Sequence, residues 1–245
     1  MTSRAGPRIV LIEPQLGENI GAAARAMLNC GLGDLAIVAP RDGWPNPKAV
    51  AMASGAEAIL ERARLAETLR AATGDLHRVY AATARSRDMI QRVLTPRAAA
   101  AEMRAAVAKG ERVGVLFGPE RSGLTTDQVA EAQAVIAVPL NPEFSSLNLA
   151  QAVLIVAYEW YQAEASAEPE RYDTGDSLPA DKQAVDYFAD RLERDLDAAG
   201  YFPTEEQRPT MRRNLVNLLN RARVTQQELR TLHGVVQHLV GRRPR

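Results

Sequence analysis

The chain of 245 residues is predicted to be an α/β protein, with a parallel sheet and helices on both faces. Three observations predict this class. Short apolar runs alternate with helical segments over the first two-thirds of the chain. The runs are almost continuously apolar, which indicates strands that are buried on both faces. Beyond residue 181 the patterns are helical only, so a helical extension is expected to follow the sheet.

Each predicted strand is an apolar run bounded by polar or turn-forming residues. The strands span residues 8–13, 35–39, 78–83, 112–118 and 134–140. Helices are predicted at 19–31, around 48–72, and at 96–110, 125–132 and 147–165. Pro96 stands at the start of one helix, and Gly31 and Gly110 follow the ends of two, which are favoured places for these residues.

Composition changes near residue 165. Residues 165–181 are rich in proline, glycine and acids, which is typical of a linker. We therefore expect a sheet domain over residues 1–164, a linker over 165–181 and a helical extension over 182–245. Thr225 and Glu228 have the spacing of a capping box at the start of the last helix.

Charge is distributed unevenly along the chain, although the net charge is zero. Residues 159–207 hold 4 basic and 14 acidic side chains, whereas residues 208–245 hold 9 arginines and one acid, Glu228. One interpretation is an attraction between these two segments within the chain. The other is that the arginines bind a polyanion such as RNA.

Composition excludes several classes of protein. Hydrophobic residues make up 46% and charged residues 24%, as in a globular protein that buries its own core. The single cysteine, Cys30, cannot form an internal disulfide and argues against a cysteine-based zinc site, so no metal is expected. No apolar stretch is long enough to span a bilayer, and the N-terminus lacks the apolar core of a signal peptide. We therefore expect no membrane partner and a cytoplasmic protein.

In open α/β sheets, ligands bind beyond the carboxyl ends of the strands, so we examined the segments that follow the strands. After the first strand, Asn19 stands where a helix begins, and Arg25 follows among alanines. Arg25 also fits an ordinary arginine that extends from a helix into solvent. After the third strand, residues 82–88 place Thr83 among arginines, which is equally typical of a solvated loop.

The segments after the fourth and fifth strands are less ordinary. In "FGPERSGLT", residues 117–125, Glu120 is fixed in a tight loop with Gly118 and Gly123, although many structural turns have such residues. In "PLNPEFSSLNLAQAV", residues 139–153, two serines and an asparagine open an apolar helix. One serine is expected to cap the helix, which leaves the other serine and Asn148 as additional polar groups beside free backbone amides.

Other catalytic signatures are absent from these segments. No G-x-G-x-x-G motif follows a strand, and there is no P-loop. The histidines, His77, His233 and His238, lie outside the candidate loops, so a serine–histidine triad has no base. The chemistry of the site must therefore rest on asparagine, arginine, glutamate, serine and backbone amides.

Three segments, "NIGAAARAMLNCGL", "FGPERSGLT" and "PEFSSLNLAQAV", occur in this order. Together they resemble the three motifs of the SPOUT superfamily of trefoil-knotted methyltransferases. They look most like the TrmH-type ribose 2′-O-methyltransferases, and within these like the TrmJ branch. The resemblance covers residues 8–160, and the helical extension is similar to the C-terminal part of that branch. It implies a knot in the C-terminal part of the sheet domain, a homodimer, and tRNA as the partner.

The resemblance implies methyl transfer from S-adenosylmethionine to a ribose 2′-hydroxyl of cytidine or uridine, at position 32 of the tRNA anticodon loop. The catalytic residues that it implies are Asn19, Arg25, Glu120, Ser146 and Asn148. The cofactor-binding residues that it implies are Ala82, Thr83, Ala84, Gly118, Val138, Leu140, Ser145, Ser146 and Leu147.

Alternatives remain open from the sequence. The motifs encode cofactor and reaction rather than target, so a ribosomal-RNA ribose methyltransferase fits them as well. A non-catalytic RNA-binding protein on the same fold is a second alternative, although the intact motif residues argue against it. A nucleotide-binding oxidoreductase is a third, and the missing glycine fingerprint argues against that one.

Overall fold

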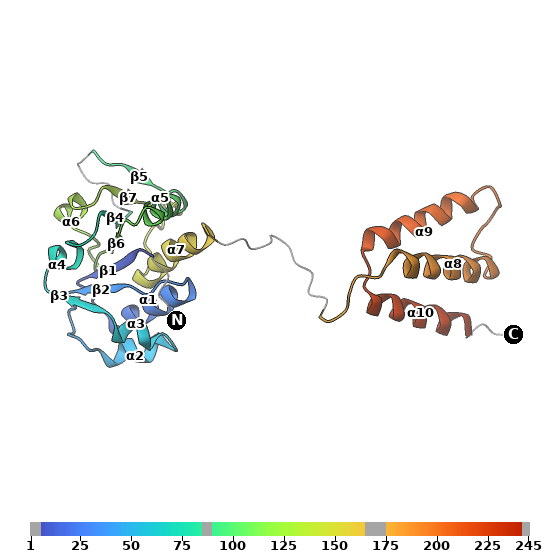
Figure 1. Cartoon of the computed structure of the whole chain (residues 1–245), viewed down its shortest axis with the longest axis horizontal. Coiled ribbons are helices and arrows are strands. Elements are labelled where there is room, and N and C mark those ends of the chain that lie inside the picture. Colours follow the sequence, from blue (N-terminus) through green and yellow to red (C-terminus); the bar gives the residue numbers. More distant parts are fainter. Residues whose placement is uncertain (1–5, 85–89, 165–174, 242–245) are drawn as a thin grey trace. The chain divides into compact units, whose positions relative to one another are not determined.

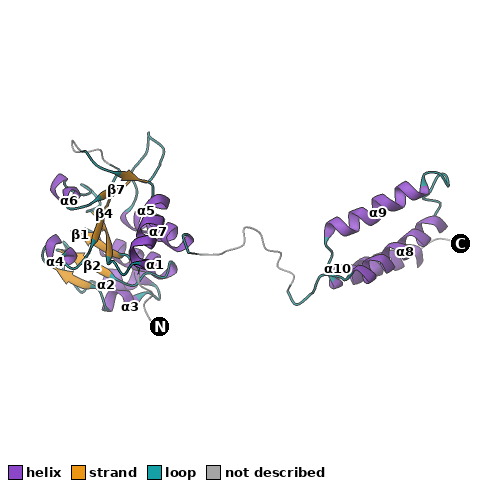
Figure 2. Cartoon of the chain, turned by 45° about the horizontal axis from the view of Figure 1, so that its top comes forward, coloured by secondary structure: helices purple, strands orange, loops and turns teal. Residues whose placement is uncertain are grey.

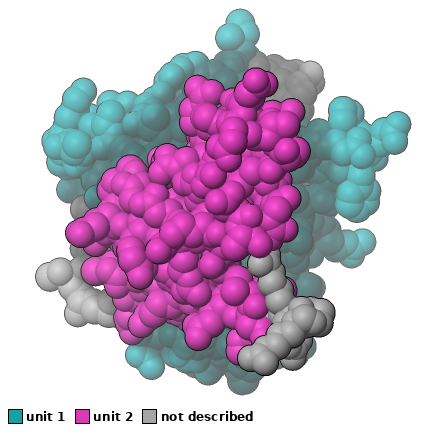
Figure 3. Space-filling model, turned by 90° about the vertical axis from the view of Figure 1, so that its right-hand side faces the viewer, with its two compact units in different colours: residues 1–167 teal, residues 168–245 magenta. Residues whose placement is uncertain are grey.

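A computed structural model describes residues 6–84, 90–164 and 175–241 (Figure 1). The chain forms two compact units, Met1–Ala167 and Glu168–Arg245, which Figure 3 colours separately. The boundaries proposed from the sequence, 1–164, 165–181 and 182–245, stay predictions. Residues 165–174 of the expected linker lie outside the described residues.

Unit 1 is built around a seven-stranded sheet (Figure 2). Its strands are β1 (Arg8–Ile12), β2 (Leu35–Val38), β3 (Arg64–Ala66), β4 (Arg78–Ala82), β5 (Val93–Leu94), β6 (Val113–Phe117) and β7 (Ala134–Ile136). They lie in the order β3-β2-β1-β6-β4-β7-β5, and all pairs are parallel. From β1 the chain adds β2 and β3 on one side, and the other four strands lie on the opposite side, with β6 inserted between β1 and β4 and β7 between β4 and β5. The strand order therefore reverses beside β1, as it does where ligands bind in open α/β sheets.

Both faces of the sheet are covered, because successive strand residues point to opposite sides. Ile9 and Leu11 of β1 belong to the larger core, and Val10 and Ile12 to the smaller one. Helices of the larger core are α1 (Gly17–Asn29), α2 (Pro47–Ala53), α3 (Glu57–Glu61), α5 (Pro96–Ala108) and α7 (Leu149–Gln162). Helices of the smaller core are α4 (Leu69–Thr73) and α6 (Thr126–Ala130). The predicted fold class is confirmed, whereas the knot stays a prediction.

Two strands were not predicted from the sequence. β3 and β5 have three and two residues and lie at the two edges of the sheet. Their side chains are mostly exposed, so they leave no apolar run to detect. β7 is also shorter than the predicted 134–140, since it ends at Ile136. Pro139 follows soon after and has no N–H with which to continue a ladder.

The small residues of α1 allow close packing against its neighbour α2. A Cβ atom on Gly21 would lie 2.1 Å from the carbonyl oxygen of Ala49, so only glycine allows this contact. Ala23 and Ala24, on the same helix, are fully buried in the larger core. The small residues that follow Asn19 therefore allow α1 to pack closely against α2 and the core.

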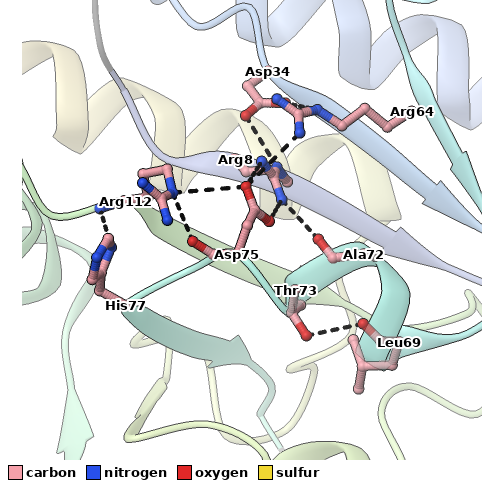
Figure 4. A network of polar contacts seen from close by, with 9 residues as sticks. All are labelled: Arg8, Asp34, Arg64, Leu69, Ala72, Thr73, Asp75, His77 and Arg112. Carbon is pink, nitrogen blue, oxygen red and sulfur yellow. Dashed lines mark hydrogen bonds and ion pairs between the residues drawn. The ribbon is translucent and has the colours of Figure 1, made fainter.

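A buried arginine at the start of β1 ties together the amino-terminal side of the sheet (Figure 4). Arg8 is only 2% exposed. Its Nε donates to Asp34 at 3.0 Å, its Nη1 and Nη2 donate to the two carboxylate oxygens of Asp75 at 2.6 and 2.9 Å, and Nη1 also donates to the carbonyl oxygen of Ala72. Arg112 donates to the backbone carbonyl of Asp75 at 2.6 Å. Such bidentate, charge-assisted contacts join segments that are distant in the sequence.

We predict that Asp75→Asn lowers the free energy of unfolding at pH 7 by about 1–3 kcal/mol, because buried Arg8 loses its bidentate partner. The hydrogen bonds from Arg8 hold the pKa of Asp75 at about 2, below the ordinary 3.8. A carboxyl group whose pKa is lowered by folding stabilises the fold at pH values above its ordinary pKa. This contribution is lost as the pH falls toward 2. The difference between variant and wild type in urea denaturation should therefore shrink between pH 5 and about 2.

Glu61→Gln is a matched control, since Glu61 is exposed and forms no ion pair with another described residue. It should leave the unfolding free energy within about 0.5 kcal/mol of the wild type. A constant difference between Asp75→Asn and wild type from pH 7 to pH 2 would contradict the role given to this ion pair.

Unit 2 consists of the helices α8 (Lys182–Ala198), α9 (Arg208–Ala222) and α10 (Gln226–Gly241) in its described part. Val185, Phe188, Leu219 and Leu229 form the centre of its core. The capping box predicted before α10 is confirmed. Glu228 accepts from the backbone N–H of Thr225 at 2.7 Å, and the Thr225 hydroxyl accepts from that of Glu228 at 3.3 Å.

The described arginines of the basic segment, residues 208–241, divide into two groups. Arg208 forms ion pairs with Glu193 and Asp197, and Arg212 with Asp190 and Glu193, all of them on α8. The predicted attraction between the acidic and basic segments therefore exists for these two side chains. Four others form no ion pair with a carboxylate of the described residues: Arg213, Arg221, Arg223 and Arg230.

Candidate functional site

A pocket of about 350 Å³ opens at the carboxyl edge of the sheet, beyond the neighbouring strands β6, β4 and β7. Its volume lies in the range of sites for small molecules and cofactors. Its wall comes from the ends of these strands, from the segment that leads to α7, and from one side of α7. It is lined by Ala82, Thr83, Ala84, Phe117, Gly118, Pro119, Glu120, Gly123, Ile136, Val138, Leu140, Ser145, Ser146, Leu147, Leu149, Ala152 and Val156.

The structure brings all nine expected cofactor-binding residues to this one pocket. They come from three separate segments, 82–84, 118–140 and 145–147. The pocket also has lining residues that sequence reasoning missed: Phe117, Pro119, Gly123, Ile136, Leu149, Ala152 and Val156. Several of these stand next to predicted residues. Those on α7 are spaced three and four apart, which is the spacing of one helix face and was the signal available in the sequence.

The chemistry of this wall suits a molecule with apolar and polar parts. Val138, Leu140 and Leu147 supply apolar surface, whereas Thr83, Ser145 and Ser146 supply hydroxyl groups. The described residues that line the pocket include no Lys or Arg, and Glu120 is their one charged side chain. The described part of the pocket wall therefore has polar groups for recognition and a single charged side chain, which is acidic.

Two glycines shape the loop between β6 and α6. A Cβ atom on Gly118 would lie 2.4 Å from the carbonyl carbon of Gly123 and from the nitrogen of Leu124, so no larger residue fits. Gly123 has φ +65° and donates its N–H to the carbonyl oxygen of Pro119 at 2.8 Å. The loop therefore folds back on itself, and its backbone forms part of the pocket wall.

A chain of hydrogen bonds joins three motif segments beside the pocket. Asn19 on α1 is 92% buried and donates from Nδ2 to Glu120 Oε1 at 2.7 Å. Its Oδ1 accepts from Nδ2 of Asn148 at 2.8 Å. Glu120 also accepts the backbone N–H groups of Gln15 and Leu16, at 2.8 and 3.2 Å. Three of the residues expected at the catalytic site therefore form one connected network.

The serine cap expected for α7 is wrong, because Asn148 caps this helix. Its Oδ1 accepts from the backbone N–H of Ala150 at 2.8 Å, and Gln151 accepts from the backbone N–H of Asn148 at 3.2 Å. Ser145 and Ser146 lie before the cap and line the pocket instead. The Asn148 amide caps the helix through its oxygen and donates to Asn19 through its nitrogen. A serine hydroxyl is shorter and has a single donor, so it is less suited to both contacts at once.

Arg25 is not part of the hydrogen-bond network of Asn19, Glu120 and Asn148. It is on α1 but is not among the residues that line the pocket. Its side chain is exposed and forms no hydrogen bond or ion pair with the described residues. Leu28, one helical turn further on the same side of α1, is also exposed. Arg25 therefore belongs to the outer surface of the helix.

We predict that Gly118→Ala weakens binding of S-adenosylmethionine, the cofactor that the motif resemblance implies, by about 10-fold or more, because the added methyl group forces the 118–124 loop out of the wall. Isothermal titration calorimetry measures the affinity, and thermal unfolding shows whether the unit remains folded. Gly234→Ala on α10 is the control, since a Cβ atom there meets nothing within 4 Å. Wild-type affinity in Gly118→Ala would contradict the tight packing of this loop.

The described residues lack the features of a membrane-spanning helix and of a metal site. Among the described residues, no helix has both the length and the apolar character needed to cross a membrane. The same part of the chain contains no group of three or more His, Cys, Asp or Glu residues that could hold a metal ion.

The parallel sheet and the pocket at its carboxyl edge define an α/β protein with a ligand site made from loops after β4, β6 and β7. The chain belongs to the SpoU rRNA methylase family, whose model matches residues 6–158. The family expected from the three motifs is thereby confirmed.

Similar proteins extend this likeness over almost the whole chain. The tRNA (cytidine/uridine/adenosine-2'-O-)-methyltransferase TrmJ of Pseudomonas aeruginosa is 35% identical over 94% of this chain and 91% of its own. The crystal structure of TrmJ from Z. mobilis ZM4 is 48% identical, with a TM-score of 0.84 over 96% of this chain and 100% of that one. A structure that concerns 2-OH methylation of C/U34 on tRNA is 27% identical, with a TM-score of 0.51 over 65% of this chain and 96% of that one.

Proposed function

We propose that this chain transfers a methyl group from S-adenosylmethionine to the 2′-hydroxyl of a cytidine or uridine ribose at position 32 of the tRNA anticodon loop. The relative from Pseudomonas aeruginosa, which carries the name of a tRNA 2′-O-methyltransferase, matches both units of this chain. We also propose that it works in the cytoplasm, where it would meet its tRNA.

The observation that carries the proposal is the network of Asn19, Glu120 and Asn148 beside the pocket. It links the three motif segments that the family shares. It also fixes the start of α7 next to Ser145 and Ser146. Structural positioning of this kind is what a displacement reaction needs, since nucleophile, methyl group and leaving group must lie in line.

The residues of the pocket fit the proposed cofactor. When bound, S-adenosylmethionine supplies a methyl group on a positively charged sulfur, which is a good leaving group. The apolar residues Val138, Leu140 and Leu147 would hold its less polar parts, and the backbone of 118–123 would contact its polar groups. Ser146 would position the ribose hydroxyl at the mouth of the pocket. The described lining residues include Glu120 and no Lys or Arg, which suits a cationic ligand.

Arg25 is proposed to bind the phosphate beside the acceptor ribose and to stabilise the alkoxide that develops there. Arginine side chains keep their proton in proteins, so we do not assign a role as base. The proton of the hydroxyl would leave to the phosphate or to water. Because Arg25 is exposed on α1 and does not line its own pocket, we propose that it acts at the pocket of a second copy in a homodimer.

The surface around Arg25 supports this dimer. Leu28 on α1 and Leu154, Tyr158 and Tyr161 on α7 are exposed, and the two helices pack against each other. Large exposed side chains on neighbouring helices are typical of a surface that a partner covers. A second copy seated there would cover these apolar groups and would bring Arg25 to the interface.

We predict that Arg25→Ala lowers kcat by about 100-fold or more while cofactor affinity is unchanged, because a charge that stabilises the transition state is lost. The kcat of Arg25→Lys should lie between those of the wild type and Arg25→Ala, since lysine keeps the positive charge but lacks the planar guanidinium group. Arg62→Ala, a change of an exposed arginine at the C-cap of α3, is the control. Near-normal turnover of Arg25→Ala on folded tRNA would contradict this role.

Mixing two inactive variants tests whether Arg25 acts across the interface. A refolded 1:1 mixture of Arg25→Ala and Ser146→Ala should recover about one quarter of wild-type activity, because half the dimers are mixed and one of their two sites is intact. If Arg25 served its own pocket, no site in the mixture would be intact. No recovery, with mixed dimers shown to form, would place Arg25 in its own site.

The experiment that tests the function is transfer of a labelled methyl group to unmodified RNA, followed by mapping of the modified nucleotide. Transfer to tRNA at position 32 is expected. The family description names rRNA, so ribosomal RNA is the second substrate to test. The structure concerned with C/U34 makes position 34 the second tRNA nucleotide to inspect. Labelling of rRNA alone would overturn the choice of tRNA.

Unit 2 is proposed to add phosphate contacts for a large RNA. α9 carries four arginines and no acid, and two of its arginines are already paired with α8. Arg213 and Arg221 are exposed and have no carboxylate partner among the described residues. Three asparagines, Asn214, Asn217 and Asn220, are exposed on the same helix. An acid-free, basic helix surface of this kind is typical of contacts with a nucleic-acid backbone.

We predict that the double variant Arg213→Gln and Arg221→Gln reduces the slope of log affinity for tRNA against log salt by about 1.4–1.8, which corresponds to two lost phosphate contacts. The matched control is Arg208→Gln with Arg212→Gln on the same helix. It breaks the ion pairs with α8, so it should lower thermal stability and leave the salt slope nearly unchanged. Equal slopes in wild type and the first variant would remove these arginines from the RNA contact.

A further inference from the structure

The segment between β7 and α7 carries an aromatic side chain that the pocket does not use. Phe144 directly precedes Ser145 and Ser146, which line the pocket, but it is not itself a lining residue. It is 75% exposed, whereas Phe117 and Phe188 are buried. Leaving such a ring in water forgoes the stabilisation that its burial would bring. Its place in the fold is therefore not explained by the core.

The backbone of Phe144 is held in a defined turn. Its N–H donates to the carbonyl oxygen of Asn141 at 3.0 Å, and the side chain of Asn141 accepts from the N–H of Glu143 at 3.1 Å. On the other side, Asn148 fixes the start of α7. The ring is therefore displayed from a segment anchored at both ends, which limits the entropy lost when it meets a ligand.

The surroundings of the ring argue for a flat, partly polar ligand. Residues 141–146 are all exposed, and apart from Pro142 the neighbours of Phe144 in this stretch are polar or acidic. Several large apolar side chains, as a protein partner would need, are exposed on α1 and α7 instead. A single aromatic ring among hydrogen-bonding groups is the arrangement by which proteins stack on unpaired bases of RNA.

The position of the ring fits the reaction. Phe144 is two residues from Ser146, so their Cα atoms are at most about 7 Å apart. In a nucleotide, the base and the 2′-hydroxyl are attached to adjacent carbons of the ribose. A ribose whose hydroxyl reaches the pocket mouth at Ser146 would therefore place its base within reach of residue 144.

We propose that the ring of Phe144 stacks on the base of the nucleotide whose ribose receives the methyl group. This inference rests on the proposed function and adds a positioning residue to it. Stacking is tolerant of base identity, because every base has an aromatic face. Phe144 thus holds the acceptor nucleotide in place and leaves the choice among bases to other contacts.

The test uses the full-length protein and an RNA stem–loop that contains the mapped acceptor nucleotide. Phe144→Ala should raise Kd for this RNA and KM by about 5- to 100-fold, with the Kd for S-adenosylmethionine unchanged. Phe144→Tyr and Phe144→Trp should stay within about threefold of wild type, since they keep an aromatic face. Phe144→Leu, which keeps apolar bulk only, should behave like Phe144→Ala. Leu65→Ala, a change of an exposed apolar residue on edge strand β3, is the control.

A second RNA separates base stacking from any other role. It carries an abasic ribose at the acceptor position, so the 2′-hydroxyl remains and the base is gone. Wild type should lose affinity for this RNA by the same factor as it loses through Phe144→Ala, and Phe144→Ala should lose at most about twofold more. If the loss of affinity from Phe144→Ala and the loss from the abasic RNA multiplied when combined, the proposal would be overturned. Wild-type affinity of Phe144→Ala for the intact RNA would also overturn it.

Two further outcomes are distinguishable. If Phe144→Ala changed the oligomeric state in light scattering, the ring would be covered by a second copy, and base stacking would be wrong. If wild type transferred no methyl group to any ribose, the proposed function itself would fail. The binding measurements with intact and abasic RNA do not depend on turnover, so the two failures are recognised separately.

Discussion

The candidate site depends on the hydrogen-bond chain from Glu120 through Asn19 to Asn148. Each amide in it is used in two directions: Asn19 donates to Glu120 and accepts from Asn148, while Asn148 donates to Asn19 and accepts from the backbone of α7. Only a side chain with both a donor and an acceptor can do this. An aspartate at position 19 would have no donor for Glu120 and would place two carboxylates side by side. The need for an amide side chain at positions 19 and 148 therefore follows from the network as much as from any ligand.

This network matters because the pocket wall is made largely of irregular segments. β7 ends at Ile136 and α7 begins at Leu149, so the residues between them are not held by a strand ladder or a helix. The Asn148 cap fixes one end of this segment, and the turn at Asn141 fixes its middle. The strands below provide a rigid floor, since they are buried on both faces. A rigid sheet with loops fixed at a few points is the usual way in which folds support sites.

Much of the fold could be predicted from the sequence, because its central strands are long apolar runs. The exceptions have physical causes. β3 and β5 are short, exposed edge strands, so burial leaves no pattern in them. At the site, proximity of 82–84, 117–123 and 145–147 follows from parallel strands whose carboxyl ends meet at one edge. The cap of α7 could not be chosen from the sequence, because serine and asparagine both cap helices and the choice depends on Asn19, 129 residues earlier in the chain.

The role of Arg25 depends on surfaces that the sequence of a single chain does not define. Its position in the sequence gives its distance along α1 but not the direction in which it points relative to a pocket built by later segments. The described lining residues include no Lys or Arg, and in the proposed reaction an RNA substrate would bring a phosphate to the mouth of the pocket. The cation of the proposed mechanism then comes from a surface that the described part of unit 1 leaves exposed. Arg25 is on such a surface, beside exposed Leu28 and close to the helix that carries Leu154 and Tyr158. The same apolar surface that would hold two copies together would thus deliver the missing charge, so that assembly and catalysis depend on one interface.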